Sequence, residues 1–261
     1  MEISGAVVIV TGASTGLGAA TARLFGQHGA KVALAARSLD KLQHLAADLP
    51  DAIAVPVDLR DPEAIRQLVT EVHGRYGRVD AVINNAGQGM HGFLEQVEVA
   101  QYRLLMDLNL YGPLFMMQTV IPFMRQQGGG LILNVSAPLG QMPVLPSLGA
   151  YGSTKAALTV MTLTARAELA ANQIRVCAFY PGMMATEMNA HLLPASTVQP
   201  VAVAWEAGDT LPPDAPQPET PEVVAGSLLD AFQREEAEYR TEGFVKLATW
   251  VRRMATPQPH P

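Results

Sequence analysis

Tyr151 and Lys155 lie four residues apart in the segment YGSTKAAL. The flanking residues favour a helix, and side chains spaced by four share one face of a helix. A phenol beside an ammonium group can act as an acid-base pair, because the cation stabilises the phenolate. An isolated pair of this kind is more often structural, with Tyr151 at an interface and Lys155 in solvent, so the assignment depends on the elements that position the two side chains.

A glycine-rich turn is a second candidate for chemistry. Gly12, Gly16 and Gly18 lie between the apolar run AVVIV and the amphipathic segment GAATARLF. Glycine allows tight turns and a close approach of the backbone to a pyrophosphate, while the N-terminus of the next helix offers free N–H groups. The turn therefore predicts dinucleotide binding, although its GxxxGxG spacing differs from the commoner GxGxxG.

Arg37 and Ser38 follow the second apolar run, KVALAA, where the adenosine ribose is expected. A carboxylate there would bind the 2′-hydroxyl of NAD, whereas an arginine accommodates the 2′-phosphate of NADP. Ser38 could add a phosphate contact. We expect NADP rather than NAD; the alternative is that Arg37 is a solvent-exposed loop residue.

Short apolar runs alternate with longer amphipathic segments through the first 186 residues of the chain. This alternation is typical of β-α-β units, whose parallel strands read as continuous apolar runs because both faces are covered. We predict one α/β domain over residues 1–261, a Rossmann-type, doubly wound parallel sheet. Residues from about 187 to 221 contain seven prolines and predict a lid, and a C-terminal helical segment is expected from about 222 to 254.

Composition excludes several classes of function. The formal net charge is -6 and no basic stripe is present, so no nucleic-acid partner is expected. The lone Cys177 lies in an apolar run typical of a buried strand, and no cluster has the spacing of metal ligands. The N-terminal run GAVVIV is too short to span a membrane and leads into the glycine turn, so we expect a cytoplasmic protein.

Five motifs together resemble the short-chain dehydrogenase/reductase family: TGASTGLG, NNAG, Asn109 in DLNLYG, YGSTK and PGMMAT, in this order. The resemblance implies a Rossmann-type fold, NAD(P) binding and hydride transfer between the cofactor and an alcohol or carbonyl. It also implies that Tyr151 is the general acid-base, Lys155 its activator and ribose anchor, and Asn109 part of a water-mediated proton path. A close ammonium and a nicotinamide cation would together lower the pKa of Tyr151 towards neutrality.

By the same resemblance, Asp58 would meet the adenine, Asn85 to Gly87 would line the cofactor, and Thr186 would hold the nicotinamide amide. The full set of expected cofactor-binding residues is Gly12, Ser14, Thr15, Gly16, Leu17, Gly18, Arg37, Ser38, Asp58, Leu59, Asn85, Ala86, Gly87, Tyr151, Lys155, Pro181, Gly182 and Thr186.

The chain departs from the family pattern at one catalytic position. Family members carry a serine just past the strand, and here that position falls on Ala137 counting from Asn134, or on Pro138 counting back from Tyr151. Loss of one such donor typically lowers the rate by about 100-fold to 1000-fold. Three explanations remain open.

In the first, the enzyme is active and tolerates the loss or uses another hydroxyl. Ser136 could serve only if a bulge or bend turned it towards the site, and Ser147 could reach in from its loop. In the second, Ala137 is a substitution introduced into a natural serine position. In the third, the protein binds the cofactor without catalysis.

The substrate is predicted to be an apolar secondary alcohol or ketone, because the proposed lid carries many apolar residues. Ala137, Met142, Met183 and Met184 are the candidate substrate contacts. The alternative is that the segment is a surface excursion that contacts no substrate. The resemblance and the apolar helices predict a homodimer or homotetramer.

Overall fold

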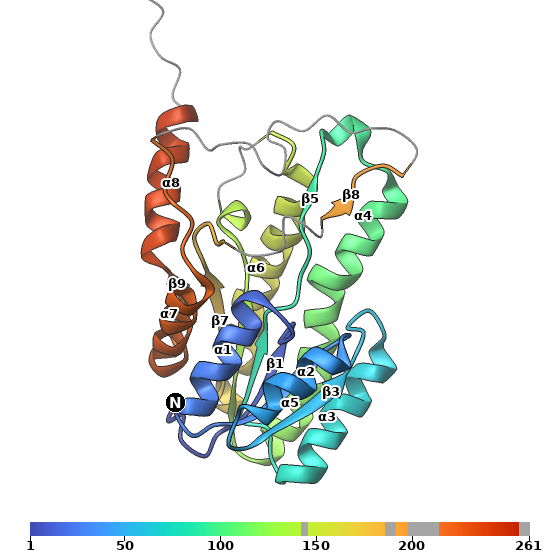
Figure 1. Cartoon of the computed structure of the whole chain (residues 1–261), viewed down its shortest axis with the longest axis vertical. Helices are drawn as coiled ribbons and strands as arrows, with labels where there is room; N and C mark the ends of the chain where they lie inside the picture. The colour runs from blue at the N-terminus through green and yellow to red at the C-terminus, as the bar shows by residue number, and fades with distance from the viewer. Residues whose placement is uncertain (142–145, 186–191, 198–213, 256–261) are drawn as a thin grey trace, which may run out of the picture.

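The computed structural model describes residues 1–141, 146–185, 192–197 and 214–255 of the chain (Figure 1). Its central sheet has seven parallel strands in the order β3-β2-β1-β4-β6-β7-β9. These strands are β1 (Val7–Thr11), β2 (Lys31–Ala36), β3 (Ala52–Pro56), β4 (Ala81–Asn84), β6 (Gly130–Val135), β7 (Ile174–Tyr180) and β9 (Glu238–Arg240). The strand order reverses between β1 and β4, which confirms the predicted doubly wound α/β domain.

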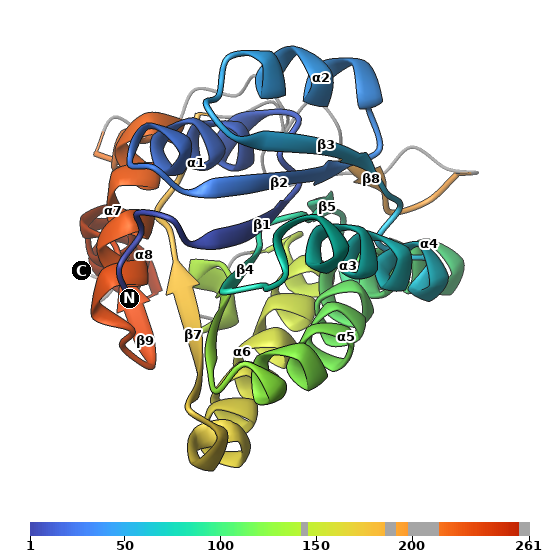
Figure 2. The same cartoon turned by 90° about the horizontal axis from the view of Figure 1, so that it is seen from below.

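Helices cover both faces of the sheet (Figure 2). One layer contains α1 (Gly16–Gln27), α2 (Leu39–Ala47) and α7 (Pro221–Arg234). The opposite layer contains α3 (Pro62–Tyr76), α5 (Gly112–Gln126) and α6 (Gly149–Leu169). The remaining elements are a two-stranded sheet of β5 (Met90–His91) and β8 (Leu193–Pro194), helices α4 (Val99–Met106) and α8 (Glu242–Ala255), 3₁₀ turns at Leu94–Gln96, Pro138–Gly140 and Ala170–Asn172, and a π-helical turn at Asp107–Tyr111.

Strand β1 shows why the strands read as unbroken apolar runs. All five of its residues are buried. Because successive side chains point to opposite faces, Val8 and Val10 pack in the layer of α1 and α7, whereas Val7 and Ile9 pack in the layer of α3 and α5. Both faces of the strand therefore belong to the core.

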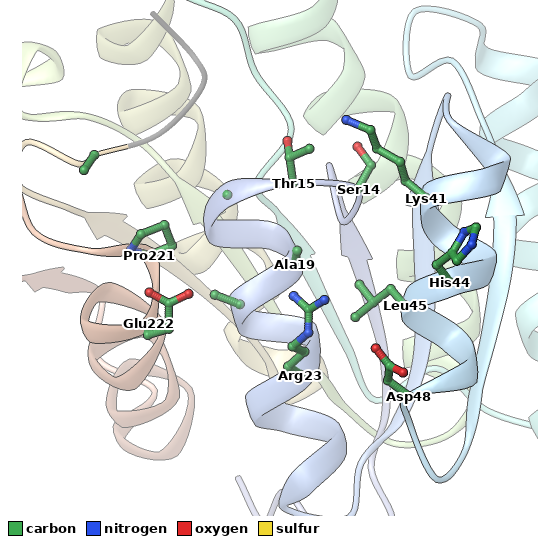
Figure 3. Close-up of a pocket in the computed structure, with 13 residues that line it drawn as sticks. Ser14, Thr15, Ala19, Arg23, Lys41, His44, Leu45, Asp48, Pro221 and Glu222 are labelled. Atoms are coloured by element: carbon green, nitrogen blue, oxygen red, sulfur yellow. The ribbon is translucent and has the colours of Figure 1, made fainter.

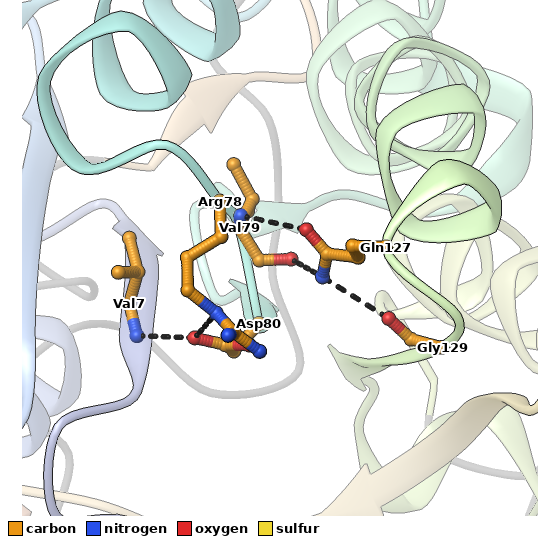
Figure 4. A network of polar contacts seen from close by, with 6 residues as sticks. All are labelled: Val7, Arg78, Val79, Asp80, Gln127 and Gly129. Carbon is orange, nitrogen blue, oxygen red and sulfur yellow. Dashed lines mark hydrogen bonds and ion pairs between the residues drawn. The ribbon is translucent and has the colours of Figure 1, made fainter.

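The amino-terminal edge of the sheet is fixed by a network of polar side chains (Figure 4). The carboxylate of Asp80 accepts hydrogen bonds from the backbone N–H of Val7 at 2.8 Å and from Nε of Arg78 at 2.8 Å. The side chain of Gln127 donates to the carbonyls of Val79 and Gly129 and accepts from the N–H of Val79. Strands β1, β4 and β6 are thereby joined at the edge opposite the glycine turn.

Residues Val99–Gln126 form a helical run of 28 residues whose most apolar window has a mean hydropathy of 1.2. Its length and composition would allow it to cross a membrane, and the core helix of a soluble protein passes the same test. Here 39% of the window is buried, and Met116, Val120 and Met124 pack on the sheet. We interpret the run as a core helix.

Candidate active site

The glycine turn between β1 and α1 lies at the carboxyl edge of the sheet. Gly12 and Gly16 have φ angles of 67° and 54°, in the left-handed region that favours glycine. A Cβ on Gly18 would collide with the carbonyl oxygen of Gly12, so the turn closes only with glycine there. Thr15 occupies the N-cap of α1 without a side-chain cap, which suits phosphate binding by the N–H groups of the first helical turn.

A hollow of about 500 Å³ opens beside this turn, between α2 and α7 (Figure 3). Ser14, Thr15 and Gly16 line it at the turn, and Lys41 of α2 points its ammonium group towards the hydroxyl of Ser14 in the view. Neither Tyr151 nor Lys155 lines the hollow. Among the residues expected to bind the cofactor, Ser14, Thr15 and Gly16 line the hollow, whereas Arg37 and Asp58 do not.

The residues predicted to meet the adenosine differ in what they can contact. Arg37 and Ser38 are exposed between β2 and α2. Asp58 forms an ion pair with Arg60 at 2.6 Å, and the hydrogen bond from Arg60 holds the pKa of the carboxyl below its usual range, with a smaller contribution from the charge of Arg37. Leu59 is buried in the core, so only its backbone can face a ligand.

The NNAG segment is held against the glycine turn by its own polar groups. The side chain of Asn85 donates to the carbonyl of Thr11 at 2.9 Å. The hydroxyl of Thr11 accepts from the backbone N–H groups of Asn85 and Ala86 and donates to the carbonyl of Ile83. The segment predicted to line the cofactor thus has a fixed position beside the turn.

Helix α6 brings Tyr151 and Lys155 into the interior at this edge of the sheet. Tyr151 is 9% exposed and Lys155 is 4% exposed. The ammonium of Lys155 donates to the carbonyl of Val135, at the end of β6, at 2.9 Å. Within the described part of the chain, the hydroxyl of Tyr151 makes no hydrogen bond, so a substrate oxygen could take that place.

Burial shifts the pKa of both groups towards the neutral form. Desolvation raises the pKa of Tyr151 to about 12 and lowers that of Lys155 to about 8. The shift of Tyr151 is opposite to the lowering expected from a nearby ammonium and nicotinamide, because burial of the phenol dominates in the protein alone. Tyr151 is accordingly protonated at neutral pH, ready to donate a proton.

Asn109 lies in the π-helical turn before α5 and is fully buried. Its side chain accepts from the N–H of Gln88, donates to the carbonyl of Gln88, and donates to the hydroxyl of Thr154, one residue before Lys155. A Cβ on Gly87 would lie 3.2 Å from the Asn109 amide oxygen and 3.4 Å from the Lys155 ammonium. The structure therefore brings three of the residues proposed for the site, Asn109, Gly87 and Lys155, close together.

The position of the missing serine is filled by Ala137, and the two serines considered as replacements, Ser136 and Ser147, lie in different surroundings. Ala137 packs in one apolar cluster with Tyr151, so a methyl group occupies this part of the site. Ser136 continues the ladder to β7 without a bulge, and its hydroxyl donates to the carbonyl of Lys155 and lies 3.0 Å from Thr159. This geometry does not favour a catalytic role for Ser136. Ser147 is buried at a φ of 65°, a strained conformation for serine.

The segment after β7 approaches α8 closely. A Cβ on Gly182 would lie 2.5 Å from the backbone of Gly243, which explains the glycine after Pro181. Met183 packs on the cluster that contains Trp250, and Met184 packs on the core beneath α1 and α7. Neither methionine joins the cluster around Tyr151, so their predicted substrate role gains no support. Thr186 and Met142 lie outside the described residues.

Two residues that position the site were missed from the sequence. Thr11 holds the NNAG segment, and Thr154 contacts the amide of Asn109. Both belong to quoted motifs, Thr11 to TGASTGLG and Thr154 to YGSTK, and that membership was the available signal. Their partners are distant in sequence, and only the folded chain shows them.

Comparison with known proteins identifies the family and supports the fold. The sequence model described as "short chain dehydrogenase" matches residues 6–196. The chain belongs to the short-chain dehydrogenase family. An uncharacterized oxidoreductase from Staphylococcus saprophyticus is 32% identical to this short-chain dehydrogenase over 213 residues, covering 80% of this chain and 85% of the relative.

Solved structures agree with this assignment. A short-chain dehydrogenase from Streptomyces avermitilis shares 27% identity with a TM-score of 0.78, covering 96% of this chain and 93% of the other. A metagenomic short-chain oxidoreductase in complex with NADP shares 29% identity with a TM-score of 0.72, covering 92% and 98%. A Burkholderia phymatum enzyme in complex with NAD, at 22% identity and a TM-score of 0.83 over 100% and 99%, shares the fold of this short-chain dehydrogenase.

Proposed function

We propose that this short-chain dehydrogenase uses NADP to interconvert an apolar ketone and a secondary alcohol. The observation that carries the proposal is the position of Tyr151, buried beside Lys155 at the sheet edge that also presents the glycine turn. A protonated phenol aimed at the substrate side and a cofactor site at the same edge are the requirements for this chemistry.

The surroundings of Tyr151 support an apolar substrate. Its cluster contains Met90, Leu105, Ala137 and Ala195, with Leu193 packed against it. A ligand that approaches the phenol therefore meets mainly hydrocarbon, and burying an apolar substituent there is favourable. A polyol would leave its other hydroxyls unpaired against these side chains.

In the reductive direction, a nicotinamide cofactor held at the glycine turn would supply a hydride to the carbonyl carbon. Tyr151 donates its proton to the carbonyl oxygen, and the new O–H bond completes the alcohol. The ammonium of Lys155 stabilises the phenolate left on Tyr151, and Asn109 holds the backbone of Gln88, next to Gly87 and its neighbouring Lys155 ammonium. Tyr151 carries its proton at neutral pH in the protein alone, as reduction requires, and burial raises its pKa further, to about 12.

The preference for NADP rests on side-chain charge. Arg37 is exposed between β2 and α2. Lys41 lies in the first turn of α2 and faces the hollow beside Ser14. Two cations near the expected ribose favour a 2′-phosphate, whereas a carboxylate would favour the hydroxyl of NAD.

The decisive experiment measures oxidation of NADPH by the wild type and by Ala137→Ser across apolar and polar ketones. We expect turnover of apolar ketones by the wild type and an increase of about 100-fold in the variant, because the serine adds a donor beside Tyr151. An unchanged rate in the variant would show that another hydroxyl donates a hydrogen bond to the substrate oxygen, or that the reaction needs no such donor. NADPH binding without turnover by either protein would favour a non-catalytic binding protein.

We also propose that the chain forms a homodimer through the helical layer of α4 to α6. Val99, Tyr111 and Val160 are exposed there by 64%, 42% and 66%. Light scattering during gel filtration should give twice the monomer mass, and Val160→Glu should shift the population to monomer. A monomeric wild type at micromolar concentration would contradict the proposal.

A further inference from the structure

Residues 192–197 lie against the substrate side of Tyr151 although they are more than 40 positions away in sequence. Strand β8 pairs in parallel with β5, where Met90 is opposite Leu193 and the N–H of Leu193 donates to the carbonyl of Gly89 at 3.0 Å. Leu193 and Ala195 join the apolar cluster of Tyr151. This short segment is a wall of the proposed substrate site.

A single carboxylate fixes the far end of this wall. Glu98, at the start of α4, accepts a hydrogen bond from the hydroxyl of Ser196 at 2.6 Å. It also accepts from the backbone N–H and the hydroxyl of Thr197, each at 3.1 Å. The N–H of Glu98 itself donates to the carbonyl of Ala195 at 2.8 Å. Three donors converge on one charged group, which is an expensive arrangement to break.

We propose that Glu98 is a positioning residue that holds residues 192–197 as the apolar wall facing Tyr151, and so determines the preference for apolar ketones. The inference rests on the proposed function. Glu98 lies at the end of the wall and its carboxylate accepts hydrogen bonds from Ser196 and Thr197 of the wall, so we expect it to act on the substrate through Leu193 and Ala195. The side chain makes no capping hydrogen bond to α4, so the helix start does not depend on it.

The test compares Glu98→Ala with Glu98→Gln and with Glu95→Ala, an exposed carboxylate three residues away. Glu98→Ala should lower kcat/KM for apolar ketones by about tenfold or more through a higher KM, with kcat changed less. The Kd of NADPH, measured by fluorescence without ketone, should stay within twofold. Glu98→Gln keeps one acceptor oxygen and should recover most of the activity, and Glu95→Ala should match the wild type.

A second measurement does not depend on turnover. Hydrogen exchange should be faster at the amide of Thr197 in Glu98→Ala than in Glu95→Ala, because that N–H loses its acceptor. Equal exchange in the two variants would overturn the inference, as would an NADPH Kd that rises in parallel with the ketone KM. If the wild type reduces no ketone while exchange at Thr197 responds as expected, the proposed function fails and the anchoring by Glu98 stands.

Discussion

Key polar side chains at the two edges of the central sheet differ in how many hydrogen-bond partners they have. At the amino edge, Asp80 and Gln127 are saturated by backbone groups and by Arg78 (Figure 4). At the carboxyl edge, Lys155 is buried with a single hydrogen bond to a backbone carbonyl, and the hydroxyl of Tyr151 has none within the described residues. The first arrangement stabilises the fold, whereas the second leaves hydrogen-bonding capacity for a ligand.

This difference has an energetic consequence. A buried polar group without its full set of partners destabilises the folded state by about 1 to 3 kcal/mol, and a saturated one does not. Mutations at the amino edge should therefore lower stability and spare activity, and mutations at the carboxyl edge should lower activity and spare stability. The following experiments test that contrast.

The largest effect is expected for Tyr151→Phe. Removing the proton donor should lower the rate of ketone reduction by about 100-fold to 10,000-fold. Urea unfolding should show stability equal to or above that of the wild type, since the lost hydroxyl has no partner to leave unpaired. NADPH binding serves as the control for an intact cofactor site, and a variant that keeps more than a tenth of the wild-type rate would remove Tyr151 from the mechanism.

At the amino edge, Asp80→Ala should reduce the free energy of unfolding by about 2 to 3 kcal/mol, because the N–H of Val7 and the guanidinium of Arg78 lose their acceptor. Below the melting transition, kcat/KM for the ketone should stay within twofold of the wild type. The matched control is Glu63→Gln, whose exposed pair with Arg66 should contribute less than about 1 kcal/mol. A strong loss of activity in folded Asp80→Ala would erase the contrast between the edges.

The variant Lys155→Met tests the burial of the ammonium group through the pH dependence of the free energy of unfolding. Burial lowers the pKa of Lys155 from 10.5 to about 8, so the unfolded chain binds the proton more tightly between these values. Stability of the wild type relative to the variant should therefore rise by about 2 kcal/mol from pH 7 to pH 10. Urea unfolding at both pH values measures this, and other titrating groups cancel because both proteins contain them. A pH-independent difference would mean that Lys155 is solvated.

The smallest effect is expected at the adenosine end. Arg37→Ala should raise the Kd of NADPH about tenfold while leaving the Kd of NADH within twofold, because only the 2′-phosphate carries the extra charge. Fluorescence titration of the two cofactors provides the comparison. Equal losses for both would assign Arg37 to a general role in cofactor binding.

Much of the fold was predictable because parallel strands covered on both faces must be continuously apolar. The alternation of such runs with amphipathic helices predicted the doubly wound sheet, and β1 shows the reason in its five buried residues. The ends of α3 follow local rules that can be recognised in the sequence. Asp61 caps α3 ahead of Pro62, and Gly77 ends it at a φ of 75°.

Only the motif residues of the candidate site were predictable from the sequence. Spacing placed Tyr151 and Lys155 on one face of α6, and the motifs indicated Asn109 and the glycine turn. Strand alternation indicated that Ser136 needs a bulge to face the site, but the hydrogen bond from its hydroxyl to the Lys155 carbonyl of α6 could not be read from the sequence, because it depends on how α6 packs on the sheet. Thr11 and Glu98 likewise form hydrogen bonds with residues that are distant from them in sequence, Asn85 and Thr197 respectively.

The sequence by itself determined the fold class and the family, because these depend on periodicity and on motifs at fixed spacing, and it proposed Tyr151 and Lys155 as the acid-base pair. The tertiary structure alone decided the burial of Tyr151 and the position of residues 192–197 beside it. Burial, which raises the pKa of Tyr151 to about 12, and the convergence of residues 192–197 on Glu98 both arise from contacts between segments that are distant in sequence.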